Sequence, residues 1–179
     1  MKREISERHP IREFFSESIQ ASLRDCLGLR DTEAVELYLA AMLVDFVSFE
    51  GIFAIRDASG RSVQSLPELL AEGDVRLRAD SFAREREVHR HIGDLLLFWS
   101  GLYPEFLPRL AAVPGDPVEQ AVRQGSLSYH VVSTFEHSPY GEQAGTFRKL
   151  SVHFDEYRTG LSLLRASFDR VSGSEGFGA

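Results

Sequence analysis

The chain has 179 residues, of which 43% are hydrophobic and 26% charged, and 20 Lys+Arg against 27 Asp+Glu give a formal net charge of −7. These values are typical of an ordinary folded domain. They exclude intrinsic disorder, a collagen-like repeat and, with Cys26 as the single cysteine, a disulfide scaffold. The acidic balance also disfavours nucleic acid as a partner, because phosphate neutralisation dominates that kind of binding.

The first ten residues are charged and lack the apolar run of a secretory signal, so export is not expected. No stretch offers the ~20 nearly uncharged residues that a membrane span needs. The two most apolar windows, 34–55 and 95–107, are interrupted by charges or by Gly and Pro. We therefore expect a cytoplasmic protein without membrane contact, and the lone cysteine agrees with this.

Two helices are predicted in the N-terminal third. The first begins at Pro10, carries apolar residues at three- and four-residue steps, and ends near Gly28, which is suited to a C-terminal cap. The second is capped by Asp31 or Thr32 and ends near residues 49–51. Because the second helix is apolar on two opposite sides, we expect it to be central and packed between neighbours.

Residues 52–64 are compatible with two structures, a small β-hairpin that turns at Gly60 or an irregular loop. An isolated hairpin is marginal in water, so it would have to pack against helices. A short helix is predicted over 66–71, with Pro67 near its start and Gly73 at its end.

The middle of the chain predicts two longer helices. One opens at Asp80 or Ser81 and is broken after Gly101, and Pro and Gly residues then make 100–117 the clearest linker-like segment. The other begins at Pro117, is apolar on two sides and is also expected to be sandwiched. The apolar stripe of the first helix consists of Val88, Ile92, Leu95 and Trp99.

The C-terminal third shows the most regular pattern. Eight apolar residues alternate at three- and four-residue steps, as in a heptad seam: Phe147, Leu150, Phe154, Tyr157, Leu161, Leu164, Phe168 and Val171. The pattern predicts a helix over 142–171, either continuous or bent at Gly160, with a neighbour that packs closely at this glycine. Residues 173–179 are expected to form a flexible tail.

These elements predict an all-α fold. We expect a single domain over 1–172, an elongated bundle of about six helices that mostly pack antiparallel, with the possible hairpin at 52–64. The helix at 142–171 is expected to anchor the other helices along its apolar edge.

Motifs of several common enzyme classes are missing from the sequence. It contains no Glu-x-x-His, no His-Glu-x-x-His, no phosphate-binding Gly-x-x-x-x-Gly-Lys-Ser/Thr and no Gly-x-Ser-x-Gly. No cofactor or metal is therefore implied, although the sequence does not decide whether the protein is an enzyme.

The best ligand-binding candidates lie on the helix that opens at residue 81. Glu85 and His89 are four residues apart at the edge of the apolar stripe, where a carboxylate could orient an imidazole as a general base or ligand, with His91 beside them. The simpler interpretation is an ordinary ion pair along the helix.

Two further pairs, His91–Asp94 and His153–Glu156, could make a four-ligand metal site if they faced each other across the bundle. However, Asp94 and Glu156 lie away from the apolar centres of their helices and are expected to face water. Tyr129, Tyr157 and Trp99 could line a pocket, or could be core aromatics with one hydrogen bond each.

The segment 98–107 is the best candidate for an interface. It carries Phe98, Leu102, Tyr103 and Phe106 among Gly and Pro residues, and aromatic residues are favoured at the centres of interfaces. The alternative is that the segment folds back over the end of the bundle.

The leading functional hypothesis is a non-catalytic protein that acts through association, with itself as a homo-oligomer or with a protein partner. The alternative is an enzyme or a small-ligand or metal-binding protein with its site inside the bundle. A third hypothesis is a nucleic-acid accessory that uses the arginine-rich segment 76–90, although acidic residues interleaved there favour a solvated, salt-bridged face.

Overall fold

The computed structural model describes residues 10–47, 49–110 and 115–174, and within them the chain forms helices and no strand. The predicted all-α class is confirmed. The α-helices are α1 (Pro10–Gln20), α2 (Glu33–Phe46), α3 (Phe49–Ile52), α4 (Leu66–Glu72), α5 (Phe82–Leu102), α6 (Leu107–Leu110), α7 (Pro117–Ser133), α8 (Gly141–Val152) and α9 (Phe154–Ser174). A π-helical turn, Ala21–Cys26, extends α1, and a 3₁₀ turn, Pro104–Phe106, precedes α6.

Short polar side chains define where three of these helices begin. Ser65, Ser81 and Asp116 each accept a hydrogen bond from a backbone N–H in the first turn of α4, α5 and α7. The first helix ends as predicted near Gly28, whose φ of +67° places it in the left-handed region. The sequence thus predicted these boundaries to within a residue or two.

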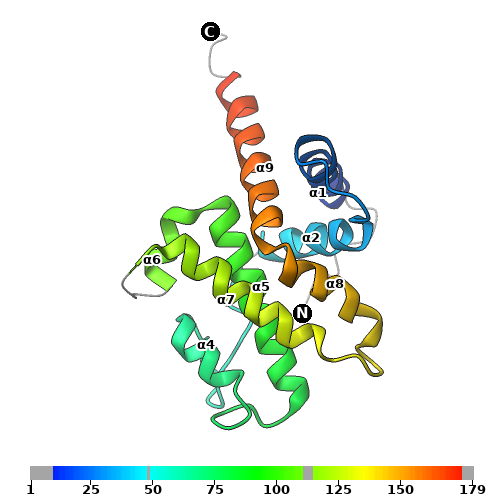
Figure 1. Ribbon diagram of the computed structural model, residues 1–179. Coiled ribbons are helices and arrows are strands. Elements are labelled where there is room, and N and C mark those ends of the chain that lie inside the picture. Colours follow the sequence, from blue (N-terminus) through cyan, green and yellow to red (C-terminus); the bar gives the residue numbers. More distant parts are fainter. Residues whose placement is uncertain (1–9, 48, 111–114, 175–179) are drawn as a thin grey trace.

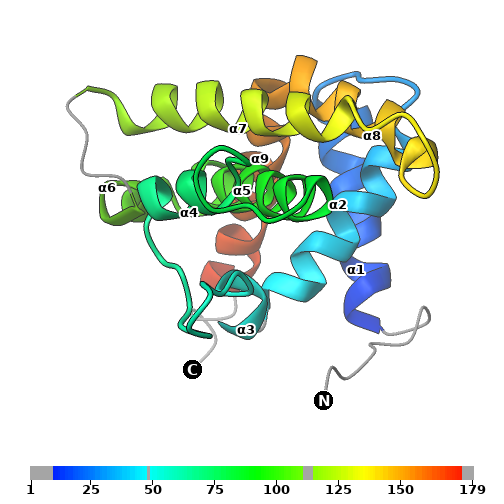
Figure 2. The same cartoon turned by 90° about the horizontal axis from the view of Figure 1, so that it is seen from below.

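The central element of the fold is α5, which packs against α4, α7 and α9 (Figures 1 and 2). Every residue from 91 to 98 is buried, so this part of α5 is covered on all of its sides. Gly93 allows α7 to approach closely, since a Cβ at this position would lie 2.6 Å from the Tyr129 ring. The prediction that α9 anchors the other helices is therefore wrong, and α5 has this role.

The two helices that were expected to be sandwiched are covered less completely. In α2, Val35, Leu39 and Leu43 are buried, but Leu37 is 62% exposed. In α7, Leu127 is 54% exposed. Each of these helices has neighbours on one side and leaves part of its second apolar side in water.

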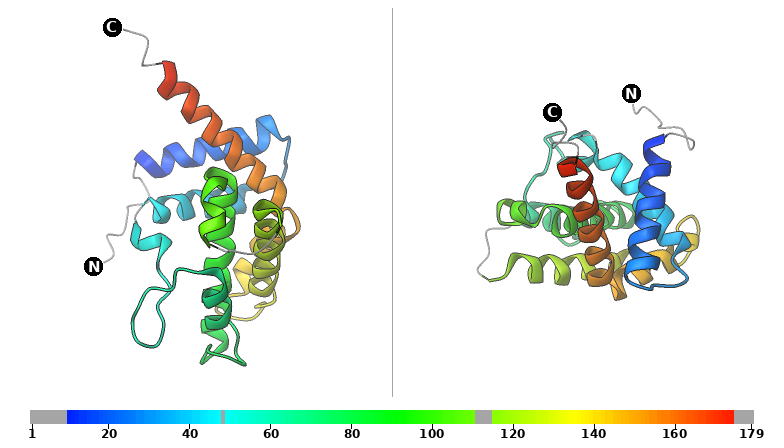
Figure 3. Two further views of the ribbon diagram at one scale, coloured as in Figure 1. Left: turned by 90° about the vertical axis from the view of Figure 1, so that its left-hand side faces the viewer. Right: turned by 90° about the horizontal axis from the view of Figure 1, so that it is seen from above.

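The heptad seam of the C-terminal third belongs to two helices rather than one. The helix breaks at His153, where φ is −112° and ψ is 32°, and not at Gly160. Phe154 then directs its ring against α7, where Gly125 leaves room for it. Before the break, α8 lies along α7. After it, α9 turns away, crosses α1 and extends beyond the rest of the fold (Figures 1 and 3).

Gly160 lies inside α9, and the expected close neighbour is there. A Cβ at this glycine would lie 2.5 Å from Cδ2 of Leu23, which belongs to the π-helical turn after α1. Nearer the end of α9, the Phe168 ring stacks on Phe14 of α1 at 5.3 Å. The predicted tail begins late, because α9 runs to Ser174, and residues 175–179 lie outside the described part of the chain.

The segment 52–64 combines features of both predicted alternatives. A single antiparallel bridge joins Arg56 to Ser62, and the Val63 N–H donates to the Ile55 carbonyl at 2.9 Å. The Asp57 carboxylate accepts hydrogen bonds from the Ser59 side chain and the backbone N–H of Arg61, which lower its pKa to about 2. The turn is therefore ordered by one carboxylate, although the described residues form no two-stranded sheet.

Across the described ranges, none of the helices has an apolar stretch long enough to cross a lipid bilayer.

Candidate functional site

A pocket of about 740 Å³ opens beside the N-terminal half of α5. Tyr38 of α2 and residues 139–143, from the turn before α8 and its first residues, form other parts of its wall. Three arginines of α5 line it, namely Arg84, Arg86 and Arg90. Two carboxylates, Asp80 and Glu87, also line the pocket, and the three guanidinium groups differ in whether they have an anionic partner.

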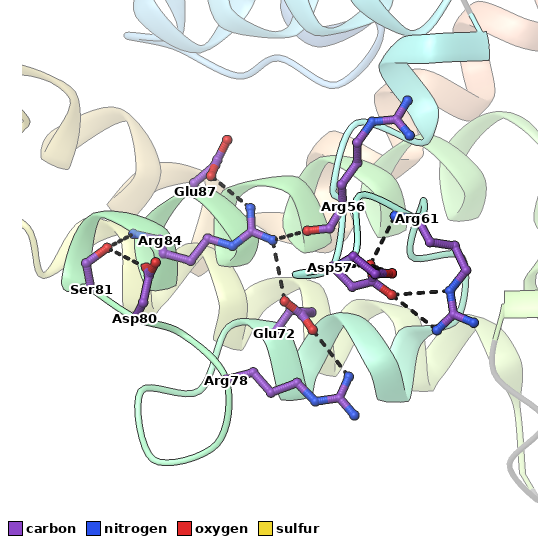
Figure 4. A network of polar contacts seen from close by, with 10 residues as sticks. Arg56, Asp57, Arg61, Glu72, Arg78, Asp80, Ser81, Arg84 and Glu87 are labelled. Carbon is purple, nitrogen blue, oxygen red and sulfur yellow. Dashed lines mark hydrogen bonds and ion pairs between the residues drawn. The ribbon is translucent and has the colours of Figure 1, made fainter.

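Arg84 is fully engaged by its neighbours (Figure 4). One of its Nη atoms lies 3.1 Å from a Glu87 carboxylate oxygen, and the other lies 3.5 Å from the buried Glu72 carboxylate and donates to the Arg56 carbonyl at 2.6 Å. Arg78 also pairs with Glu72 at 3.2 Å. This network ties α4 and the segment at Arg56 to the start of α5, so Arg84 has a structural role.

Arg86 is buried, with 7% of its surface exposed, and has no such partner. Its Nη2 donates to the Gln143 amide oxygen at 2.7 Å, and its guanidinium carbon lies 4.2 Å from the centroid of the Tyr140 ring. The ion pairs found among the described residues do not include Arg86, and its buried Nε has no hydrogen-bond partner there. Arg86 is thus a buried cation held by an amide and ring faces.

The electrostatics of Arg86 reflect this environment. Burial, and then the neighbouring Arg90 guanidinium, lower the pKa of Arg86 from its ordinary value. An arginine does not lose its proton in water near neutral pH, so the positive charge stays, and its desolvation is offset by an amide and two aromatic rings but by no anionic partner among the described residues. An anion in the pocket would supply the missing charge.

Arg90 links the pocket to a buried carboxylate. Its Nη1 lies 3.8 Å from Oδ2 of Asp94, while the hydroxyls of Tyr38 and Tyr129 both donate to Oδ1, at 2.6 Å and 2.8 Å. Asp94 is only 4% exposed. Burial raises its pKa to about 6, although Arg90 and the two hydroxyls oppose this shift.

The residues that the sequence proposed as a ligand site, Glu85, His89 and His91, lie outside this pocket. His89 directs Nδ1 towards Ser128 Oγ at 3.3 Å, and none of the hydrogen bonds in the described chain joins it to Glu85. His91 points to another side of α5, where its ring lies 6.0 Å from that of Phe46. Burial and the nearby Arg90 lower the pKa of His91 to about 4. None of these three residues lines the pocket.

The hypothetical four-ligand metal site is not formed either. His153 and Glu156 make an exposed pair at 3.3 Å, and Asp94 bonds to tyrosines instead of His91. Within the described ranges, no group of three or more His, Cys, Asp or Glu residues could hold a metal ion. The expectation that Asp94 faces water is wrong, because the described helices cover α5 on that side as well.

The predicted interface segment is divided between core and surface. Phe98 and Leu102 are buried, so they belong to the core of the described chain and not to its surface. Tyr103 and Phe106 are 39% and 37% exposed, and the guanidinium groups of Arg165 and Arg109 lie over their rings at 5.0 Å each. The structure leaves the interface prediction open for these two aromatic residues.

Sequence reasoning missed Arg86 and Tyr38 as pocket residues and Asp94 as a buried one. Arg86 lies opposite the apolar stripe of its helix, where a charged residue indicates a solvated face. The sequence did contain one sign that α5 is buried. Together with the apolar stripe, Leu96, Leu97 and Phe98 place apolar residues on every side of the helix.

No known protein-family model matches the chain, and no curated protein or solved structure shows detectable similarity to it.

Proposed function

We propose that the protein binds a small anion, such as a carboxylate, sulfonate or phosphate compound, in the pocket beside α5. The observation that carries this proposal is Arg86, a guanidinium that is buried in the pocket wall without an anionic partner. Leaving a charge buried and unpaired costs several kcal/mol in order of magnitude, a cost that folding alone does not require.

The other groups around Arg86 suit an anion. Guanidinium groups bind carboxylate and phosphate oxygens with two parallel N–H donors, and Arg90 lies one helical turn further along α5. The Tyr140 ring and the Gln143 amide, which also line the pocket, contact Arg86. The arginine is therefore positioned before a ligand arrives, which reduces the entropy lost on binding.

We propose binding rather than catalysis, since the carboxylate–imidazole pair that suggested a general base lies outside this pocket. Glu85 and His89 are not in its lining, and His89 is turned towards Ser128. The pocket is lined by guanidinium groups, tyrosines and an amide, which can hold an anion non-covalently, and by the carboxylates of Asp80 and Glu87, of which Glu87 is paired with Arg84.

The test is a thermal-shift screen of anions in a low-chloride buffer, followed by calorimetry. Sulfate, phosphate, citrate, benzoate and benzenesulfonate are suitable probes. A probe at ten times its Kd is expected to stabilise the folded chain by about 1.4 kcal/mol, or roughly 3–6 °C in Tm. The Arg86→Gln variant should lose this shift. Arg123→Gln, which removes an exposed charge outside the pocket, is the matched control and should keep it. Equal shifts in wild type and Arg86→Gln, or no shift with any probe, would contradict the proposal.

Association with another protein is the second candidate function, and the half-exposed Tyr103 and Phe106 favour it. These two rings lie 6.3 Å apart and are flanked by Arg109 and Arg165, a combination that is enriched at interfaces. Light scattering at increasing protein concentration tests self-association. If this surface mediates it, Phe106→Asp should dissociate the assembly. Leu127→Asp, at another exposed apolar position, should not.

A further inference from the structure

The hydrogen bonds and ion pair beneath the pocket connect it to Asp94, a buried group that the proposed function does not use. Two lining residues, Tyr38 and Arg90, also contact Asp94, at 2.6 Å and 3.8 Å. We infer that the pocket takes up one proton together with its anion, and that the proton binds to Asp94 when the anion draws Arg90 away. This inference rests on the proposed anion binding.

The two oxygens of Asp94 have different partners. Both tyrosine hydroxyls donate to Oδ1, whereas Oδ2 has Arg90 as its ion-pair partner, at the long distance of 3.8 Å. A carboxyl protonated on Oδ2 can therefore keep both bonds on Oδ1. Tyr38 and Tyr129 are fixed donors here, because burial and the Asp94 charge raise the pKa of each hydroxyl well above its ordinary value.

Arg90 is a partly exposed member of this network. Its side chain is 41% exposed, and it reaches both the pocket and Asp94. Burial alone would lower the pKa of Arg90, but Asp94 and Tyr38 raise it, so it remains a cation throughout. An anion bound between Arg86 and Arg90 competes directly with Oδ2 for the Arg90 guanidinium.

The charges around Asp94 favour the transfer of a proton from solvent once this competition occurs. Tyr38 of α2 and Tyr129 of α7 face Asp94. The Asp45 carboxylate of α2 raises the proton affinity of Asp94, whereas Arg90 of α5 opposes its protonation. When Arg90 pairs with the anion, its positive charge is shared between the anion and Asp94, and a second negative charge has arrived. A proton from water then neutralises Asp94, so that anion and proton enter together.

Thermodynamic reciprocity gives a quantitative expectation. If the anion raises the proton affinity of Asp94, the proton raises the affinity for the anion by the same factor. Above the apo pKa of about 6, the Kd of an anion of constant charge should increase by up to about tenfold per pH unit. Below this pH the Kd should level off.

The experiment measures Kd and proton uptake for sulfate and benzenesulfonate, whose charges stay constant from pH 5 to 8. Isothermal titration calorimetry in two buffers of different ionisation enthalpy should show an uptake approaching one proton per anion near pH 7. Asp94→Asn, which can still accept both tyrosine bonds, should bind with the low-pH affinity of the wild type at every pH and take up no proton. His89→Gln is the control for a neighbouring titratable group and should retain the pH dependence.

The possible failures are distinguishable. Binding that requires Arg86 but is independent of pH would overturn the inference and leave the proposed function intact, as would a pH dependence that persists in Asp94→Asn. Absence of any binding from pH 5 to 8 would overturn both. If Asp94→Asn does not fold, the ¹³C shift of the wild-type Asp94 carboxyl decides. The inference requires that saturating sulfate at pH 7 convert it from the ionised to the protonated value, and an unchanged shift would refute it.

Discussion

Arg86 shows how a single buried charge can lower the stability of a fold. Its charge is buried, its Nε lacks a hydrogen-bond partner among the described residues, and its compensation consists of one amide and two aromatic faces. Cation–π contacts contribute about 2 kcal/mol each at best, which is less than the order of magnitude for burying an unpaired ion.

We expect Arg86→Met to unfold with a free energy equal to that of the wild type or higher by about 1–2 kcal/mol, because an apolar chain of similar length removes the buried charge. The same variant should lose anion binding. Urea denaturation without added anions measures the first effect. A loss of more than about 2 kcal/mol would mean that Arg86 is a structural residue and would weaken the argument for a ligand.

Asp94 and His91 make opposite contributions to stability over the same pH range. The pKa of Asp94 is raised from 3.8 to about 6, so the folded state holds this proton more tightly, and that stabilisation is lost as pH rises from about 4 to 6. The pKa of His91 is lowered from 6.5 to about 4, so the stabilisation from its neutral form is lost as pH falls through this range. Each effect is on the order of 3 kcal/mol, and they nearly cancel.

Substitution of either residue should therefore expose the pH dependence of stability that the other residue contributes. Asp94→Asn is expected to lose stability on acidification from pH 6.5 to 4.5, whereas His91→Leu should gain it, and the wild type should change least. Denaturation curves at several pH values measure these slopes. Parallel curves for all three proteins would show that neither group titrates as its environment indicates.

At the scale of single elements, the apolar pattern predicted most helices but not the break between α8 and α9. Phe147 and Leu150 before the break, and Phe154 and Tyr157 after it, are all buried in the same core. Apolar residues can continue to alternate at three- and four-residue steps across a change of helix direction when the apolar faces of both helices pack against the same core. Directly after the break, the Phe154 ring packs against Gly125 on α7, and no local pattern in the sequence indicates that contact.

Gly160 provides a test of helix packing at the same scale. Alanine is normally the better helix former by about 1 kcal/mol, so an open position would gain stability from Gly160→Ala. Here the new Cβ would lie 2.5 Å from Leu23 Cδ2, and because Leu23 is buried in the core its methyl group has little room to move aside, so we expect a net loss of about 1–3 kcal/mol. Gly145→Ala in α8, where nothing lies within 4 Å, is the matched control and should stabilise. Thermal or urea unfolding of the two variants would contradict this expectation if both gained stability.

At the scale of the whole molecule, the sequence predicted the all-α class but identified the wrong central helix. Heptad regularity pointed to the C-terminal third, and apolar residues on two sides pointed to α2. The true centre, α5, carries charged residues such as Arg86, Arg90 and Asp94, which lowers its average apolarity and hides its burial. The candidate site was missed for the same reason, since charges that a neighbouring helix buries look like solvated charges in the sequence.

Arg86 and Arg90 lie on the same helix as the most deeply buried turns of the fold. Ligand binding in the pocket should therefore be thermodynamically linked to the stability of the core. A ligand that binds to the first half of α5 would also stabilise its second half, against which α7 and α9 pack. Amide exchange rates deep in the hydrophobic centre should then report on events at the mouth of the cavity.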